Sequence, residues 1–123
     1  MEYLGKNNEL LAQAGPGHYY ILDAQITRFD VYYENEQLYI DVYFLLPYNR
    51  FKTDKRLKLH FIGVTEYEFH WDNLFNFYTV ERYKFFRSEK GYYLSTDPYD
   101  EAETVLDEDG DIIFSSEVEG YFV

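Results

Sequence analysis

The sequence predicts a mostly β fold: a curved antiparallel sheet, a sandwich or a small barrel of about seven or eight short strands, with a short N-terminal helix. Aromatic residues make up 22% of the 123 residues, including 15 Tyr and 11 Phe, and such rings are enriched in strands. Short stretches of alternating apolar and polar residues recur between turn residues, without long helical stretches between them. We expect one domain over residues 1–123, with a core that needs no disulfide, since the chain has no Cys.

The first part of the chain predicts a helix followed by a β-hairpin. Residues 7–14 contain helix formers, and a Gly-Pro-Gly stop follows them. The stretch 20–33 favours a strand whose alternation slips near Arg28, which indicates a bulge. Residues 34–37 are polar and favour a turn, and residues 38–44 then alternate cleanly. Two such stretches joined by a short polar loop are typical of a hairpin.

The rest of the chain predicts further strands after a charged loop at residues 50–56. Gly63 indicates a bend, and residues 88–91 contain Gly and favour a second hairpin turn. The strands are expected at residues 56–64, 65–71, 83–87, 92–95, 112–114 and 118–122.

The net charge of −12 is concentrated in the second half of the chain. Residues 1–62 are nearly neutral, whereas residues 97–123 hold 10 acidic residues and no basic one. Nucleic-acid binding requires Lys and Arg against phosphates, and anionic membranes repel such a chain, so we expect neither partner. The charge would attract and steer a basic protein partner, and solubility alone is the other interpretation of this charge. The N-terminus does not resemble a secretory signal, and no stretch is apolar enough to span a membrane, so we expect a cytoplasmic protein.

Residues that could carry chemistry do not form a recognised catalytic pattern, so we expect a protein that is not an enzyme and needs no cofactor. His60 and His70, with Asp72, have the residue types of a two-His, one-carboxylate metal site, but outward-facing strand residues are the favoured interpretation. The acidic run Asp107, Asp109 and Asp111 fails the EF-hand pattern at its Gly and Glu positions. A solvated acidic turn is favoured there, and a looser oxygen cage stays open as an alternative.

The last third of the chain carries a family resemblance. The sequences at 91–101 (GYYLSTDPYDE), 107–113 (DEDGDII) and 117–121 (EVEGY) resemble small acidic bacterial proteins, among them immunity proteins of polymorphic and contact-dependent toxin systems. This resemblance implies a protein that neutralises a toxin by stoichiometric binding. It transfers no catalytic residues.

We therefore predict a non-enzymatic inhibitor that binds a basic toxin domain through an acidic, Tyr-rich face. Its predicted binding residues are Tyr93, Asp97, Tyr99, Asp100, Glu101, Asp107, Glu108, Asp109 and Asp111. The alternative is a domain for small ligands or carbohydrates, with a concave pocket lined by Tyr39, Tyr43, Tyr67 and Trp71. A monomer and a homodimer are both compatible with the sequence.

Overall fold

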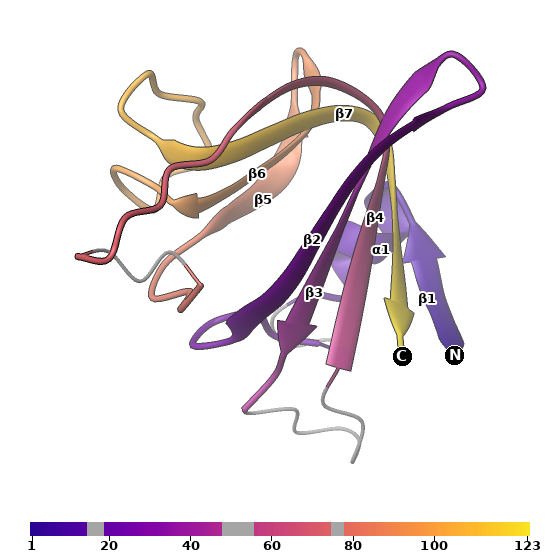
Figure 1. Cartoon of the computed structure of the whole chain (residues 1–123), viewed down its shortest axis with the longest axis horizontal. Coiled ribbons are helices and arrows are strands. Elements are labelled where there is room, and N and C mark those ends of the chain that lie inside the picture. Colours follow the sequence, from indigo (N-terminus) through magenta and orange to yellow (C-terminus); the bar gives the residue numbers. More distant parts are fainter. Residues whose placement is uncertain (15–18, 48–55, 75–77) are drawn as a thin grey trace.

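The computed structural model describes residues 1–14, 19–47, 56–74 and 78–123 (Figure 1). The predicted helix stop at 15–17 and the charged loop, apart from Arg56, fall outside these ranges. The described residues form one curved, unclosed antiparallel sheet and one short helix, which confirms the mostly β prediction. The elements are β1 (Glu2–Lys6), α1 (Asn8–Ala12), β2 (Gln25–Glu34), β3 (Gln37–Leu45), β4 (Arg56–Glu68), β5 (Lys84–Ser88), β6 (Gly91–Asp97) and β7 (Gly110–Phe122).

The two longest strands, β4 and β7, connect the two halves of the sheet. The strand order is β2-β3-β4-β7-β6-β5, and β7 pairs with β4 along most of its length. On its other side β7 pairs first with β6 and then, through its C-terminal half, with β1. In Figure 1 the sheet curves strongly, so that β2 and β3 lie across a concave space from β5 and β6.

A bend in β4 produces much of this curvature. Gly63 has φ of +66°, and the register with β7 shifts between Val64 and Glu66. The bend expected at Gly63 is therefore confirmed, but the two strands predicted on either side of it are one continuous strand. The bulge places an extra residue in β4 while its pairing with β7 continues. This extra residue interrupts the alternation of apolar and polar residues, so the sequence indicated two strands. The stretches 112–114 and 118–122 are likewise parts of the single strand β7.

Both predicted hairpins form. The β2–β3 loop consists of Asn35 and Glu36, which both have positive φ, as a two-residue turn with right-handed twist requires. The bulge expected near Arg28 lies between Ile26 and Arg28. The sequence analysis did not predict β1, a five-residue strand whose formation depends on its pairing with β7.

The core fills the concave side of the sheet. The helix α1 contributes Leu10, which packs against Gly120 so closely that a Cβ there would overlap the Leu10 side chain. One loop segment, residues 78–80, extends the sheet beside the start of β2: the N–H of Ile26 donates to the carbonyl of Tyr78, and that of Val80 to the carbonyl of Ala24. The fully buried side chains include Tyr19, Ile21, Ile40, Val42, Phe44, Leu57, Leu59, Phe61, Leu94, Ile113 and Val118.

Candidate functional site

The acidic loop between β6 and β7, residues 98–109, is held by one buried lysine. Lys84 begins β5, and its side chain is 1% exposed. Its ammonium group donates to the carbonyl of Thr104 at 2.7 Å and pairs with Asp109 at 3.1 Å and Asp100 at 2.9 Å. Burial alone would lower the pKa of Lys84, but the two carboxylates raise it above its ordinary value. A charged lysine therefore holds both ends and the middle of this loop.

Asp109 is the second anchor of the loop. Its carboxylate also accepts hydrogen bonds from the hydroxyl of Tyr93 at 2.7 Å and from the backbone N–H groups of Tyr99 and Leu106. Burial by itself would raise the pKa of Asp109, but these donors and Lys84 together lower it below the ordinary aspartate value. Asp109 is thus an ionised internal group that shapes the loop.

The nine predicted binding residues divide by burial into three groups. The exposed residues are Asp97, Tyr99, Glu101, Asp107 and Glu108. Asp100 is partly exposed and pairs with Lys84. The side chains of Tyr93 and Asp109 are buried, which corrects their expected place on a binding surface, because they support the loop from inside. Asp111 is also buried, but it lines the cavity described below. The sequence analysis also missed Lys84 as a functional residue. The one indication in the sequence was a basic residue at the start of a predicted strand that is otherwise rich in aromatic rings.

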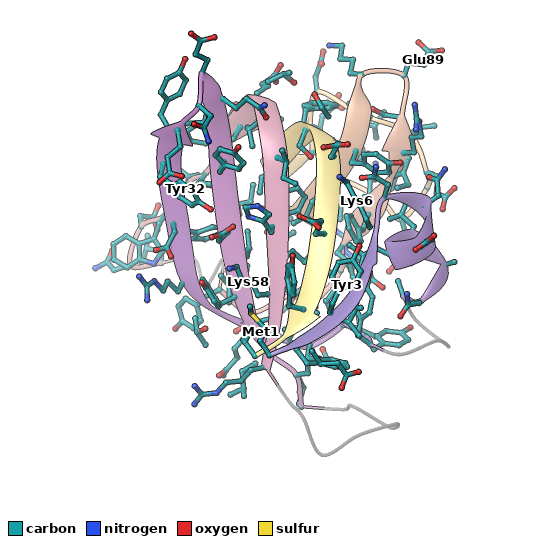
Figure 2. The ribbon with its side chains drawn as sticks, turned by 90° about the vertical axis from the view of Figure 1, so that its right-hand side faces the viewer. Met1, Tyr3, Lys6, Tyr32, Lys58 and Glu89 are labelled. Atoms are coloured by element: carbon teal, nitrogen blue, oxygen red, sulfur yellow. The ribbon has the colours of Figure 1, made fainter. Side chains whose placement is uncertain are left out.

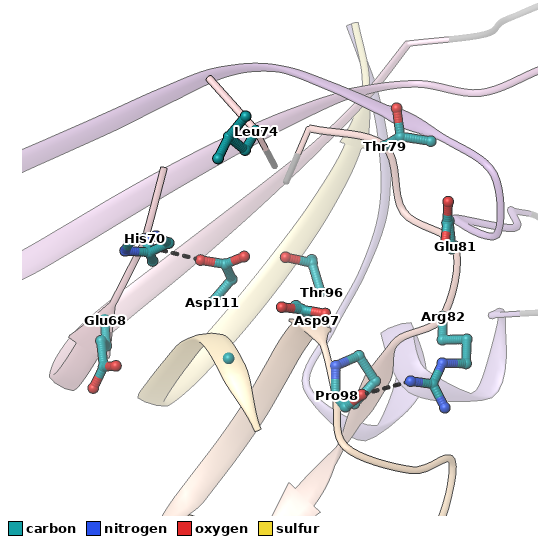
Figure 3. A pocket seen from close by; sticks show the side chains of 11 residues that line it. Glu68, His70, Leu74, Thr79, Glu81, Arg82, Thr96, Asp97, Pro98 and Asp111 are labelled. Carbon is teal, nitrogen blue, oxygen red and sulfur yellow. Dashed lines mark hydrogen bonds between the residues drawn. The ribbon is translucent and has the colours of Figure 1, made fainter. Parts of the chain in front are cut away.

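A cavity of about 540 Å³ opens beside this loop, at the open end of the concave side. Its walls come from the end of β4, the end of β6, the start of β7 and the segment around Thr79 (Figure 3). Four carboxyl groups line it, namely those of Glu68, Glu81, Asp97 and Asp111. Arg82 also lines it and donates to the carbonyl of Pro98 at 3.1 Å. Carboxylates therefore outnumber guanidinium groups four to one in this cavity.

Asp111 is the deepest of these acids. It is 5% exposed and has φ of +51°, a conformation that Asp and Asn adopt more readily than most residues. Its Oδ1 accepts a hydrogen bond from the backbone N–H of His70 at 2.8 Å. Burial raises the pKa of Asp111, the charges of Asp97 and Glu68 raise it further, and the hydrogen bond from His70 only partly offsets this.

Thr96 lies on β6 opposite Asp111 on β7, because Ser95 pairs with Ile112 and Asp97 pairs with Gly110. Thr96 is 7% exposed, and among the described residues its hydroxyl has no hydrogen-bond partner. In Figure 3 this hydroxyl points toward Asp111 across the cavity floor. A buried hydroxyl without a partner is uncommon in folded proteins and calls for an explanation.

The outward face of β2, β3, β4, β7 and β1 carries a second polar cluster, with rings around it (Figure 2). At its centre Asp41 is hydrogen-bonded to Nδ1 of His60, accepts from the hydroxyl of Tyr32 at 3.0 Å and lies 3.7 Å from Lys58. The ring of Tyr39 stacks on both His60 and Tyr32. Burial would raise the pKa of Asp41, but its partners lower it below the ordinary value. Because its members satisfy one another, this cluster reads as a structural part of the sheet.

The histidine and aspartate patterns do not converge on a metal site in the described residues. His60 pairs with Asp41, whereas the Nε2 of His70 lies 3.2 Å from Asp72, so the two histidines belong to separate pairs. Asp109 is already engaged by Lys84 and Tyr93. Within the described ranges, no three His, Asp or Glu side chains are placed to hold a metal ion.

The rings predicted to line a ligand pocket lie in different places. Tyr39 and Tyr43 lie on the outward face of β3, and Tyr67 and Trp71 are exposed at and beyond the end of β4. The 540 Å³ cavity is lined by none of the four, and a second cavity, of about 450 Å³, is lined by Tyr43 alone among them.

Comparison with protein-family models, curated proteins and solved structures finds no match to this chain. In the described part of the chain, no helix has the length and apolar character needed to cross a membrane. The functional argument therefore depends on the chain's own residues.

Proposed function

We propose that this chain is a non-enzymatic binding protein of the immunity type, which inhibits a basic protein by occupying its functional surface. One observation carries this proposal: exposed carboxylates gather on a loop that Lys84 and Asp109 fix in one shape, beside a cavity lined by further acids. In Figure 1 this loop lies at the left-hand end of the molecule, past the end of β6 and the start of β7.

The fixed loop suits rapid and specific binding. Surface charge of one sign attracts a partner of the other sign and raises the association rate. A loop that is already ordered loses less conformational entropy on binding than a flexible one. Tyr99 is 64% exposed among these acids and supplies a ring of the kind that contributes binding energy at interfaces.

A toxin that cleaves nucleic acid is the partner that best fits this chemistry. Such an enzyme needs Lys and Arg to contact phosphates, so its substrate cleft is basic. An inhibitor that presents carboxylates can compete with the nucleic acid for those same basic groups. The resemblance of the C-terminal third to immunity proteins, given in the sequence analysis, implies a toxin partner without specifying its activity. The alternative of a ring-lined ligand pocket has less support because the rings it requires are dispersed.

The first test is capture of proteins from the lysate of the native cell, at low and at high salt, with identification by mass. We expect one basic protein at near-equal stoichiometry, released or weakened at high salt. Capture of acidic proteins only, or of none at either salt concentration, would contradict the proposal.

The second test locates the binding face with two matched charge variants. Glu101→Gln/Glu108→Gln removes two exposed carboxylates from the loop, and Glu34→Gln/Glu36→Gln removes two at the exposed end of the β2–β3 hairpin. We expect the loop variant to associate roughly threefold more slowly at low salt and with a shallower salt dependence, while the hairpin variant keeps the wild-type rate. Equal effects of the two variants would remove the loop from the binding face.

A further inference from the structure

The acidic cavity has a charge imbalance that its own residues do not resolve. Its four carboxylates lie on four different segments, and in the described part of the chain none of them forms an ion pair. Arg82 is directed to the carbonyl of Pro98 instead. Asp111 is the most buried of the four, and its Oδ1 accepts a hydrogen bond from the backbone N–H of His70.

Thr96 adds an observation that does not depend on charge. Its side chain is more than nine-tenths buried, its hydroxyl lacks a partner in the described residues, and the hydroxyl points toward Asp111 (Figure 3). Leaving a hydroxyl unpaired in this way costs free energy unless a ligand or a water completes the hydrogen bonds. Thr96, opposite Asp111, thus marks one point in the cavity at which a hydrogen-bond partner is missing.

The arrangement of the carboxylate oxygens in this cavity favours an organic cation over a metal ion. A calcium ion requires six to eight oxygens at about 2.3–2.6 Å, and no three acidic or histidine side chains in the described ranges are gathered closely enough to begin such a shell. The cavity volume of about 540 Å³ also exceeds what a bare ion fills. A guanidinium group is planar, carries five N–H donors and always bears its charge, so it can reach carboxylates that lie apart.

We propose that this cavity is a subsite for an arginine side chain, in which Asp111 pairs with the guanidinium group and the hydroxyl of Thr96 accepts a hydrogen bond from it. Glu68, Glu81 and Asp97 line the same cavity, and their charges attract a cation. The biological source of this arginine rests on the proposed function: it belongs to the basic protein that the chain inhibits. The chemistry of the subsite can be tested without that protein.

The test is a titration of the intact chain with Nα-acetyl-L-arginine amide at low salt, followed by ¹H–¹⁵N NMR. The backbone N–H of His70 is a direct reporter, since it donates to Oδ1 of Asp111. We expect saturable shifts at His70, Thr96 and Asp111. The matching lysine derivative should bind several-fold more weakly, because an ammonium group cannot make the bidentate contact.

Two variants separate a built subsite from general attraction to an acidic surface. Asp111→Asn keeps an acceptor for His70 and a residue type suited to φ of +51°, and it should weaken the arginine derivative roughly tenfold. Thr96→Val keeps the side-chain shape, removes the hydroxyl, and should weaken binding by roughly threefold. Glu34→Gln, at an exposed acid of the β2–β3 hairpin that does not line the cavity, should leave the affinity unchanged.

Each outcome bears on the proposal. Three results would overturn the arginine subsite. The first is equal affinity of the arginine derivative for wild type and Asp111→Asn, and the second is chemical-shift changes spread along the loop instead of the cavity. The third is saturable binding of CaCl₂ that displaces the arginine derivative. If the derivative binds as expected but the chain captures no basic protein, the subsite stands and the proposed function fails. If a basic protein is captured with equal affinity by wild type and Asp111→Asn, the function stands and the subsite fails.

Discussion

The ammonium group of Lys84 lies 3.1 Å from the carboxylate of Asp109, and neither side chain is more than 1% exposed. This pair joins the start of β5 to the end of an acidic loop, 25 residues later in the chain. A buried charge pair of this kind contributes little net stability compared with an apolar pair, but removal of one partner leaves the other charge buried alone. The pair is therefore a sensitive point at which to test how the loop is held.

We expect Lys84→Met to lower the free energy of unfolding by about 3 kcal/mol or more, since it leaves Asp109 uncompensated in the interior. Urea denaturation measures this loss, and amide hydrogen exchange should show faster exchange in the loop between β6 and β7. The control is Asp100→Asn, at the more exposed partner of Lys84, for which we expect a much smaller loss. Losses of equal size would show that Asp109 is not the main anchor.

Stability should fall as the solution is acidified, because Asp41 and Asp109 have pKa values lowered below the ordinary 3.8. A carboxyl group whose pKa is lower in the folded state stabilises the fold above its unfolded pKa. That contribution is lost as the pH falls through the folded pKa. We expect the unfolding free energy, measured by urea denaturation across acidic pH, to decline below about pH 4. Asp109→Asn should be less stable at neutral pH and show a shallower decline.

Asp111 should act in the opposite direction, because its pKa is raised above 3.8. A raised pKa means that the folded state binds the proton more tightly than the unfolded state. Its stabilising contribution is therefore present below the unfolded pKa and lost as the pH rises through the folded one. We expect Asp111→Asn to match or exceed the wild type in unfolding free energy at neutral pH and to lose this advantage in acid. A variant less stable than wild type at neutral pH would contradict this expectation.

The sequence predicted the local pairings well and the long-range ones poorly. The β2–β3 and β5–β6 hairpins follow from alternation and turn residues, which act over a few neighbours. The strand β1 and the continuity of β4 across Gly63 depend on pairing with β7, which lies far along the chain. The burial of Tyr93 could not be predicted from alternation, because β6 has consecutive buried residues on both of its faces.

In the candidate site, too, the sequence predicted local features but not those that depend on tertiary contacts. The sequence located the acidic region, because charge is a property of composition. It could not separate the exposed Asp107 from the buried Asp109, because both stand in one acidic turn and only the tertiary contact with Lys84 distinguishes them. The cavity was not predicted, since its walls come from four segments spread over residues 68–111.

Two glycines with positive φ provide a matched test of the sheet geometry. A Cβ at Gly91, where φ is +114°, would overlap the backbone carbonyl of Ser115 on β7, whereas a Cβ at Gly63, where φ is +66°, meets mainly the side chain of Ser116. We expect Gly91→Ala to cost more than about 2 kcal/mol of unfolding free energy and Gly63→Ala about 1 kcal/mol. Thermal and urea denaturation of the two variants measure the difference, and the reverse order would contradict the described β6–β7 contact.

Thr96→Val should stabilise the chain that has no ligand bound. Valine has the shape of threonine without the hydroxyl, and this hydroxyl has no partner among the described residues, so the exchange removes an unpaired buried polar group. We expect a gain of about 1 kcal/mol in unfolding free energy, measured by urea denaturation at neutral pH. Ser95→Ala is the control, because the hydroxyl of Ser95 donates to the carbonyl of Gly110 at 2.7 Å and its removal should destabilise. A loss of stability in Thr96→Val would mean that the hydroxyl is already satisfied, and it would remove one of the two observations on which the arginine subsite depends.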